Sequence, residues 1–264
     1  MSAAIHRVYS EADWQTAWHE SPEITRIVRQ VAKSDHGSCR DTLFQSAYFA
    51  AGRLHDEGFT LFTNGGQPLL RRHRDAWLDE IVFRAPTTGV DGIYCPVSVE
   101  IMVSLNALEE VRAKYSRSYL SVSRLVASVN IGEFEIPPCR ILWNVIDDGA
   151  IHAIGDRLAT EVLDWIDLLD NPVSLEQQVS EHRLPLVDDV TGLEMVLSLG
   201  GPNSARRVFG RWLEEPKFAE EMKIAIDLHN RQFGPVYRCD YPTENLAVLC
   251  TCFNLLPSKR RSRT

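Results

Sequence analysis

The stretch VSVEIMVS, residues 97–104, places a branched apolar side chain at every second position. Successive side chains of a strand point to opposite faces, so this spacing predicts a strand with one buried face. The other face is at least partly exposed to solvent and carries Ser98, Glu100, Met102 and Ser104. A strand that is buried on one side is typical of an antiparallel sheet covered by helices on that side.

Four further segments are predicted to be strands from their alternation and their flanking turn residues: 59–62, 77–83, 125–131 and 141–146. A short helix over 106–114 interrupts them. Pro137 and Pro138 exclude continuous pairing between the last two strands, because proline cannot donate to a ladder. The sequence therefore predicts a mostly antiparallel five-stranded sheet.

The clearest helix is AIHAIGDRLATEVLDWIDLLDNP, residues 150–172. Its apolar residues recur every three or four positions and form one stripe at about 100° per residue: Ile151, Ile154, Leu158, Val162, Trp165 and Leu169. Asn171-Pro172 ends this helix, and Ser174 to Gln177 reads as a capping box that opens the next one. The remaining helices are expected at 21–33, 38–57, 191–199, 203–214 and 216–232.

The fold class predicted from these elements is α+β, with helices packed on the sheet and a helical C-terminal part. A break in the pattern near 184–189 favours three regions: an α+β domain over 1–186, a helical subdomain over 187–256, and a basic disordered tail over 257–264. The apolar segment 245–256 fits either a strand or a helix.

Composition limits the classes of partner. The net charge is -8 and the isoelectric point is about 5.5, which favours a basic protein partner over nucleic acid or an anionic membrane. No apolar run reaches the roughly 18 residues of a membrane helix, and the N-terminus has no secretory h-region. We expect a cytosolic protein whose six cysteines are reduced.

No sequence motif names a reaction. The chain has no phosphate-binding glycine loop, no serine elbow and no zinc spacing, so no cofactor and no metal are expected. Asp147-Asp148 follow a strand and could hold a metal together with a distant histidine, so a metal-dependent hydrolase or nuclease is an alternative function. The simpler interpretation is that the two residues form a turn and a helix cap. Gly200 to Ser204, ahead of Arg206 and Arg207, is interpreted as a helix connector rather than an anion site.

A cluster of basic residues, Arg71-Arg72-His73-Arg74, follows a Gly65 to Pro68 turn signal. We interpret it as the exposed approach to the strand at 77–83, so replacing Arg71, Arg72 and Arg74 together should leave the fold intact. The alternative is a nucleic-acid contact made by these arginines with the tail over 259–264.

The candidate site is the acidic side of the long helix, opposite its apolar stripe. It consists of Asp156, Asp164, Asp167 and Asp170. A solvated helix face is the simpler interpretation. The functional interpretation is a docking surface for a basic protein, where complementary charge raises the association rate and the specificity.

The stretch from Ile24 to Arg183 carries a pattern formed by Gly58-Phe59, the strands at 77–83 and 97–103, Ile141-Leu142-Trp143, and the helix ending Leu163-Asp164-Trp165-Ile166. In this pattern the chain resembles small α+β domains of uncharacterised bacterial proteins found among the immunity proteins of polymorphic toxin systems. The resemblance implies a non-catalytic protein that binds another protein, of immunity or accessory type, and carries over no functional residue.

Overall fold

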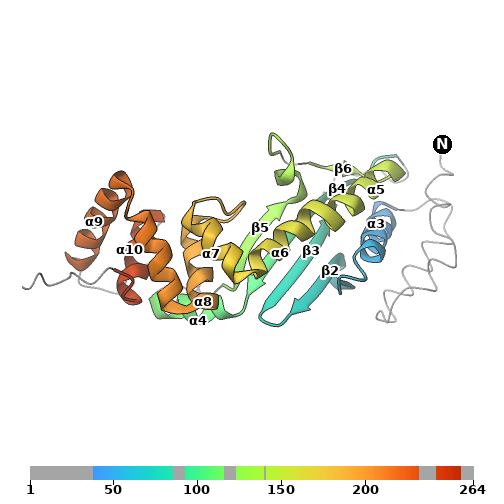
Figure 1. The fold of residues 1–264 in the computed structure, drawn as a ribbon. Coiled ribbons are helices and arrows are strands. Elements are labelled where there is room, and N and C mark those ends of the chain that lie inside the picture. Colours follow the sequence, from blue (N-terminus) through green and yellow to red (C-terminus); the bar gives the residue numbers. More distant parts are fainter. Residues whose placement is uncertain (1–37, 86–92, 116–122, 140, 232–241, 257–264) are drawn as a thin grey trace, which may run out of the picture. The chain divides into compact units, whose positions relative to one another are not determined.

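The computed structural model of this chain describes residues 38–85, 93–115, 123–139, 141–231 and 242–256. The helix predicted at 21–33 and the basic tail lie outside these residues. Within them the fold is α+β, as predicted, with an antiparallel sheet and a helical C-terminal part (Figure 1). None of the described helices combines the length and the apolar character needed to span a membrane.

The sheet contains one strand more than predicted. Its strands are β1 (Thr60–Asn64), β2 (Gln67–Arg74), β3 (Trp77–Arg84), β4 (Pro96–Leu105), β5 (Leu125–Asn130) and β6 (Trp143–Asn144). The order is β1-β2-β3-β4-β5, and the short β6 pairs with β4. The missed strand is β2, which the sequence reading assigned to a turn and an exposed approach.

The helices agree with the predicted segments and settle the ambiguous one, because 245–256 falls largely in a helix. They are α3 (Cys39–Arg53), α4 (Ala107–Tyr115), α5 (Asp148–Arg157), α6 (Leu163–Asp170), α7 (Pro172–Ser180), α8 (Asp189–Trp212), α9 (Pro216–Arg231) and α10 (Pro242–Cys252). A 3-10 turn covers Ile131–Phe134, and a π-helical turn, Leu158–Val162, joins α5 to α6. The predicted capping box at Ser174 is wrong, because Asn171 caps α7 and Ser174 lies inside it.

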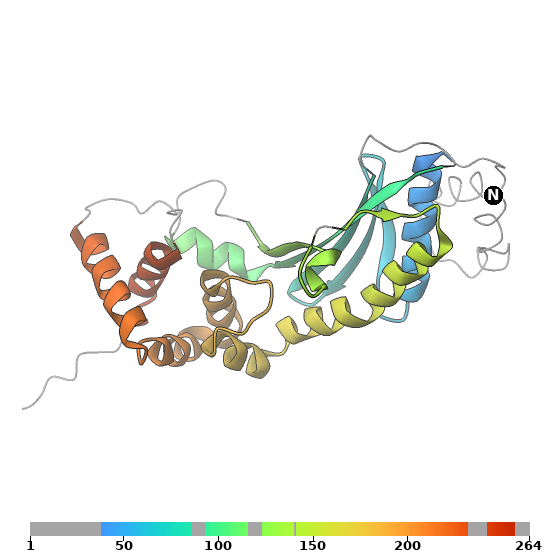
Figure 2. The same ribbon diagram turned by 90° about the horizontal axis from the view of Figure 1, so that it is seen from above.

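The described residues form two compact units. The first comprises 38–103 and 127–166, and the second comprises 104–126 and 167–256. Neither unit is a single run of sequence. The regions 1–186 and 187–256 stay a prediction. In the first unit α3 packs on β1, β2 and β3 and against α5, as both ribbon views show (Figures 1 and 2). In the second, α7 packs along α8, and α9 packs on α10.

The apolar patterns of β4 and of the long helix predict their buried residues correctly. In β4 the four branched side chains at 97, 99, 101 and 103 are fully buried, and the intervening residues are half-buried. All six residues of the long-helix stripe are buried as well. Ser38 caps α3 through a capping box with Asp41, at the helix start expected from the sequence.

A two-residue loop produces the unpredicted strand. Gly65 and Gly66 have φ values of 57° and 82°, and Asn64 pairs with Gln67 across them. Positive φ at both loop positions is the geometry whose twist matches a β-hairpin, and glycine adopts it without steric cost. The turn is therefore confined to the two glycines, and Pro68 already belongs to β2.

The hairpin register places Arg72 opposite Asp79, inside the protein. Arg72 is 5% exposed and Asp79 is 0% exposed. The Nε atoms of Arg72 and Arg74 donate to the same Asp79 Oδ2 at 2.9 and 2.8 Å. The interpretation of Arg72 as an exposed residue is wrong, and a change of all three arginines is expected to damage the fold.

The second unit is built around another buried ion pair. Arg112 of α4 donates from Nε to Oε2 of Glu194 in α8 at 2.9 Å, and both residues are buried. Its Nη1 donates to the carbonyl oxygens of Ser123 and Leu125 at 2.7 and 2.8 Å. Tyr115 donates its hydroxyl to the other oxygen of Glu194. The carboxylate is therefore paired and hydrogen-bonded on both oxygens, as a buried charge requires.

We predict that Asp79→Asn lowers the free energy of unfolding by about 3–5 kcal/mol, because it leaves the charges of Arg72 and Arg74 without their carboxylate. Urea denaturation followed by circular dichroism measures the change. The matched control is Glu80→Gln in the same strand, because Glu80 pairs with a partly exposed Arg71. This control should cost about 1 kcal/mol or less. Equal effects of the two variants would contradict a structural role for Asp79.

Candidate functional site

The structure places all four predicted docking carboxylates on the outside of the helix that runs from α5 through α6. Asp156, Asp164, Asp167 and Asp170 are exposed. Asp156 forms an ion pair with Arg53 of α3, so part of its charge is matched within the protein. No basic group among the described residues lies within ion-pair distance of Asp164. Their role in docking stays a prediction.

Asp147 and the three arginines, which the two alternative functions would use, are found in structural roles. Asp147 caps α5 by accepting a hydrogen bond from the backbone N–H of Gly149 at 2.9 Å, as the simpler interpretation predicted. In the part of the chain that the structure describes, no three His, Cys, Asp or Glu side chains gather as a metal site. Arg71 pairs with Glu80, and Arg72 and Arg74 pair with Asp79. These ion pairs compete with any phosphate for the three arginines.

A hollow of about 630 Å³ lies between α7 and α8. Sequence reasoning missed it, because the two walls come from separate helices. Its lining residues are Pro172, Val173, Leu175, Glu176, Gln177, Glu181, Val196, Leu199, Gly200, Ser204, Arg207 and Arg211. The volume is within the roughly 300–1,000 Å³ of small-molecule sites.

The α7 wall starts at a sharp helix boundary. The Asn171 side chain accepts hydrogen bonds from the backbone N–H groups of Val173 and Ser174, both at 3.1 Å. Pro172 occupies the first position of the helix, where its fixed φ is favourable and its missing N–H costs nothing. One dipeptide, Asn171-Pro172, therefore ends α6 and begins the wall of the hollow.

The α8 wall is bent in the middle. Gly201 has φ 74° and ψ -179°, a non-helical conformation, and Pro202 follows it inside the helix. This region of φ and ψ is essentially restricted to glycine. The segment interpreted as a connector between two helices is thus a kink within α8. It separates the part of α8 carrying Val196 and Leu199 from the part carrying Arg207 and Arg211.

Contacts beside the hollow hold α7 against the second part of α8. The indole N–H of Trp212 donates to the carbonyl oxygen of Val179 at 3.0 Å. His182, in the connection between the helices, stacks on Trp212 at a centroid separation of 4.8 Å, and its Nδ1 lies 2.9 Å from Oδ2 of Asp189. These contacts fix the spacing between the two walls.

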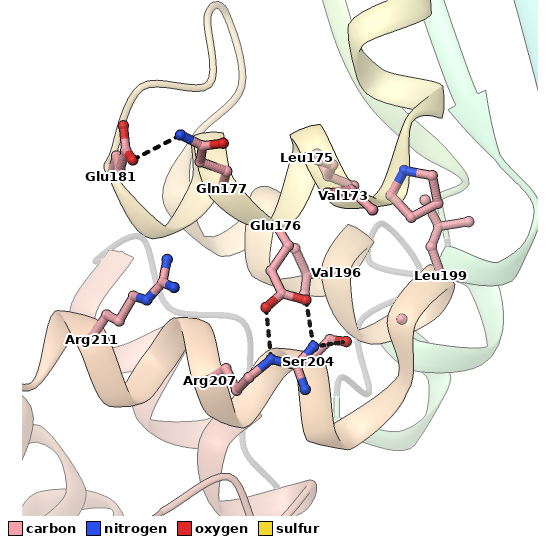
Figure 3. Close-up of a pocket in the computed structure, with 12 residues that line it drawn as sticks. Val173, Leu175, Glu176, Gln177, Glu181, Val196, Leu199, Ser204, Arg207 and Arg211 are labelled. Atoms are coloured by element: carbon pink, nitrogen blue, oxygen red, sulfur yellow. Dashed lines mark hydrogen bonds and ion pairs between the residues drawn. The ribbon is translucent and has the colours of Figure 1, made fainter.

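An ion pair bridges the two walls near the middle of the hollow. Arg207 donates from Nε and Nη2 to the two oxygens of Glu176 at 2.8 and 2.7 Å, and Nη2 also reaches Oγ of Ser204 at 2.9 Å (Figure 3). Such a two-pronged pair is geometrically specific. Ser204, Arg207 and Arg211 are three and four residues apart, which places them on one face of a helix. This spacing is the sequence signal for the α8 wall.

The Arg207 guanidinium lowers the pKa of the Glu176 carboxyl, mainly through its hydrogen bond. Burial acts in the opposite direction, and a hydrogen bond from Ser204 and the charges of Arg207 and Arg211 lower the pKa further. Glu176 therefore remains ionised at neutral pH, and its charge is matched by Arg207.

The hollow has an apolar end and a polar end. Val173 and Leu199 lie at one end, and Gln177, Glu181 and Arg211 lie at the other (Figure 3). At the polar end the Gln177 amide donates to Glu181 at 3.2 Å. The Nη1 of Arg211 donates to Oγ of Ser180 at 2.8 Å. The arrangement suits a ligand whose two ends differ in polarity.

Comparisons of the chain with protein-family models, with curated proteins and with solved structures gave no match.

We predict opposite effects for two alanine substitutions in α8. A Cβ at Gly201 or Gly210 would meet nothing within 4 Å, so backbone conformation alone decides the sign. Gly201→Ala should lower the free energy of unfolding by about 1–3 kcal/mol, because alanine is strained there. Gly210→Ala should raise it by about 0.5–1 kcal/mol, because Gly210 is helical. Urea denaturation tests both, and a stabilising Gly201→Ala would contradict the kink.

We predict that Arg207→Gln raises the pKa of Glu176 toward its ordinary value of 4.5. A lowered pKa in the folded state stabilises the protein above the unfolded-state pKa, and this stability is lost as the pH falls through the folded-state pKa. The variant should therefore lose less stability in acid. Carbon NMR of the glutamate carboxyls follows the titration directly. The control is Arg206→Gln, because the Arg206 side chain contacts Asn203 and Asn254 and not Glu176. This variant should leave the titration of Glu176 unchanged.

Proposed function

We propose that this chain acts in the cytosol by binding another protein with a basic surface, and that the acidic side of α6 takes part in the contact. The observation that carries the proposal is the exposure of Asp164, Asp167 and Asp170 on one eight-residue helix. The helix buries Trp165 and Leu169 on its other side. Its acidic side chains are thereby held on a rigid element.

The position of these acids supports a binding role. No basic residue lies in the last turn of α6, where Asp167 and Asp170 are placed. The C-terminal end of a helix carries a partial negative charge, so carboxylates there oppose the helix dipole at a cost of about 0.3–1 kcal/mol each. A basic partner would be attracted by these exposed carboxylates and by the net charge of -8.

An immunity or accessory role is the finer part of this proposal, and the pattern-level resemblance to immunity-type domains supports it. An immunity protein neutralises its partner by covering a functional surface of that partner. Many nucleic-acid-cleaving proteins carry basic surfaces, because they must bind phosphates. An acidic helix is chemically suited to covering such a surface.

The test compares the full chain with the variant Asp164→Asn/Asp167→Asn/Asp170→Asn in capture from a lysate of the organism that encodes it. A captured basic protein is then purified, and its association rate is measured by surface plasmon resonance at low and high salt. We expect the variant to lower the association rate by about tenfold or more at low salt and by less at high salt. Thermal unfolding of the free variant should show no loss of stability.

The matched control changes three exposed acids elsewhere, Glu110→Gln/Glu220→Gln/Asp227→Asn. It removes the same amount of charge and should bind nearly as the unchanged chain does. If no basic protein is captured, or if both triple variants weaken binding equally, the acidic side of α6 is not the docking surface.

A further inference from the structure

We propose that the hollow between α7 and α8 binds a small amphipathic carboxylate. The carboxylate group meets Arg211 at the polar end, and the hydrocarbon part lies along the apolar end. This inference goes beyond the proposed protein-binding function, because it concerns a different surface and needs no protein partner.

The charges that line the hollow favour an anionic group beside Arg211, at the polar end. Two arginines and two glutamates line it. Glu176 is matched by Arg207, and Glu181 pairs with Arg183 at 3.0 Å. Arg211 contacts Ser180, and within the described residues no carboxylate lies within ion-pair distance of it. Arg211 therefore has no carboxylate in direct contact at the polar end, although its charge also acts on Glu176 at longer range.

A carboxylate suits this end better than a phosphate. The guanidinium of Arg211 is planar and presents paired N–H donors that match the two oxygens of one carboxylate. A single negative charge would balance Arg211. A phosphate at neutral pH carries nearly two negative charges, and the second would stand near the ionised Glu176 without a cation to match it.

The other end of the hollow presents apolar surface that the chain itself does not cover. Val173 is 81% exposed, Leu199 is half-buried, and Leu175 and Val196 are buried beneath them. Covering exposed apolar surface gains about 25 cal/mol per Å². A hydrocarbon chain of about ten carbons would occupy part of a hollow of about 630 Å³ and leave its other end at Arg211.

The experiment measures binding of decanoate to the full chain by isothermal titration calorimetry. Decan-1-ol, which has the same hydrocarbon chain without the charge, is measured in parallel. We expect saturable binding of decanoate and binding of decan-1-ol weaker by about tenfold or more, because charge-assisted hydrogen bonds would be lost. The variant Arg211→Gln should weaken decanoate binding to a similar extent.

The matched control for charge is Arg206→Gln, since Arg206 lies on the same helix but does not line the hollow. It should bind decanoate as the unchanged chain does. The second variant is Val173→Asp, which alters an exposed side chain in the first turn of α7, where an acid is compatible with the helix. It places a negative charge at the apolar end and should also weaken decanoate binding.

Three results would overturn the proposal. They are no saturable binding of decanoate, equal affinity for decanoate and decan-1-ol, and unchanged affinity in folded Arg211→Gln or Val173→Asp. Methyl NMR shifts place the ligand independently of the variants: shifts at Val173, Leu175, Val196 and Leu199 support the proposal, and shifts confined to other methyl groups refute it. Loss of affinity in Arg206→Gln as well would show attraction by general charge and would also refute it.

Discussion

The buried pair of Arg112 and Glu194 is the interaction on which the candidate ligand site depends. It joins α4 to the first part of α8, and Tyr115 and two backbone carbonyls complete its hydrogen bonds. A buried charge without its partner is strongly destabilising, so this part of α8 has a defined position in the second unit. Val196 and Leu199 follow Glu194 along the helix, so the position of Glu194 also determines where they line the hollow. The kink at Gly201 then sets the direction of the part that carries Arg207 and Arg211.

The sequence predicts the strands and helices whose periodicity is regular, and it fails where a charged residue is buried. Asp79 occupies a position of β3 that alternation assigns to the core, between Trp77 and Ile81. A carboxylate at such a position requires a cation, and this requirement could have indicated a buried arginine nearby. What the sequence alone does not provide is the register. Only the two-residue hairpin, in which Arg74 pairs with Trp77, places Arg72 opposite Asp79.

The sequence predicts one candidate site better than the other, because only one of them depends on how two helices pack together. The acidic side of α6 is a property of one helix, so its exposure follows from the period of about 3.6 residues. The hollow depends on which face of α7 meets which face of α8, and the spacing of Ser204, Arg207 and Arg211 identifies only one of the two walls. The capping box predicted at Ser174 also placed the start of the other wall too late in the sequence. Asn171-Pro172 both ends α6 and begins α7.

Three features around the hollow are compatible with a ligand site. Gly201 holds a backbone conformation that is essentially restricted to glycine, Val173 exposes apolar surface to water, and the exposed Arg211 has no contacting carboxylate among the described residues. Elsewhere in the described core the chain satisfies its charges, as at Asp79 and Glu194. The chain pairs its buried charges and yet leaves the apolar side chain of Val173 exposed at the hollow, which departs from the pattern of its core. Such local violations are expected at sites that are completed by a ligand.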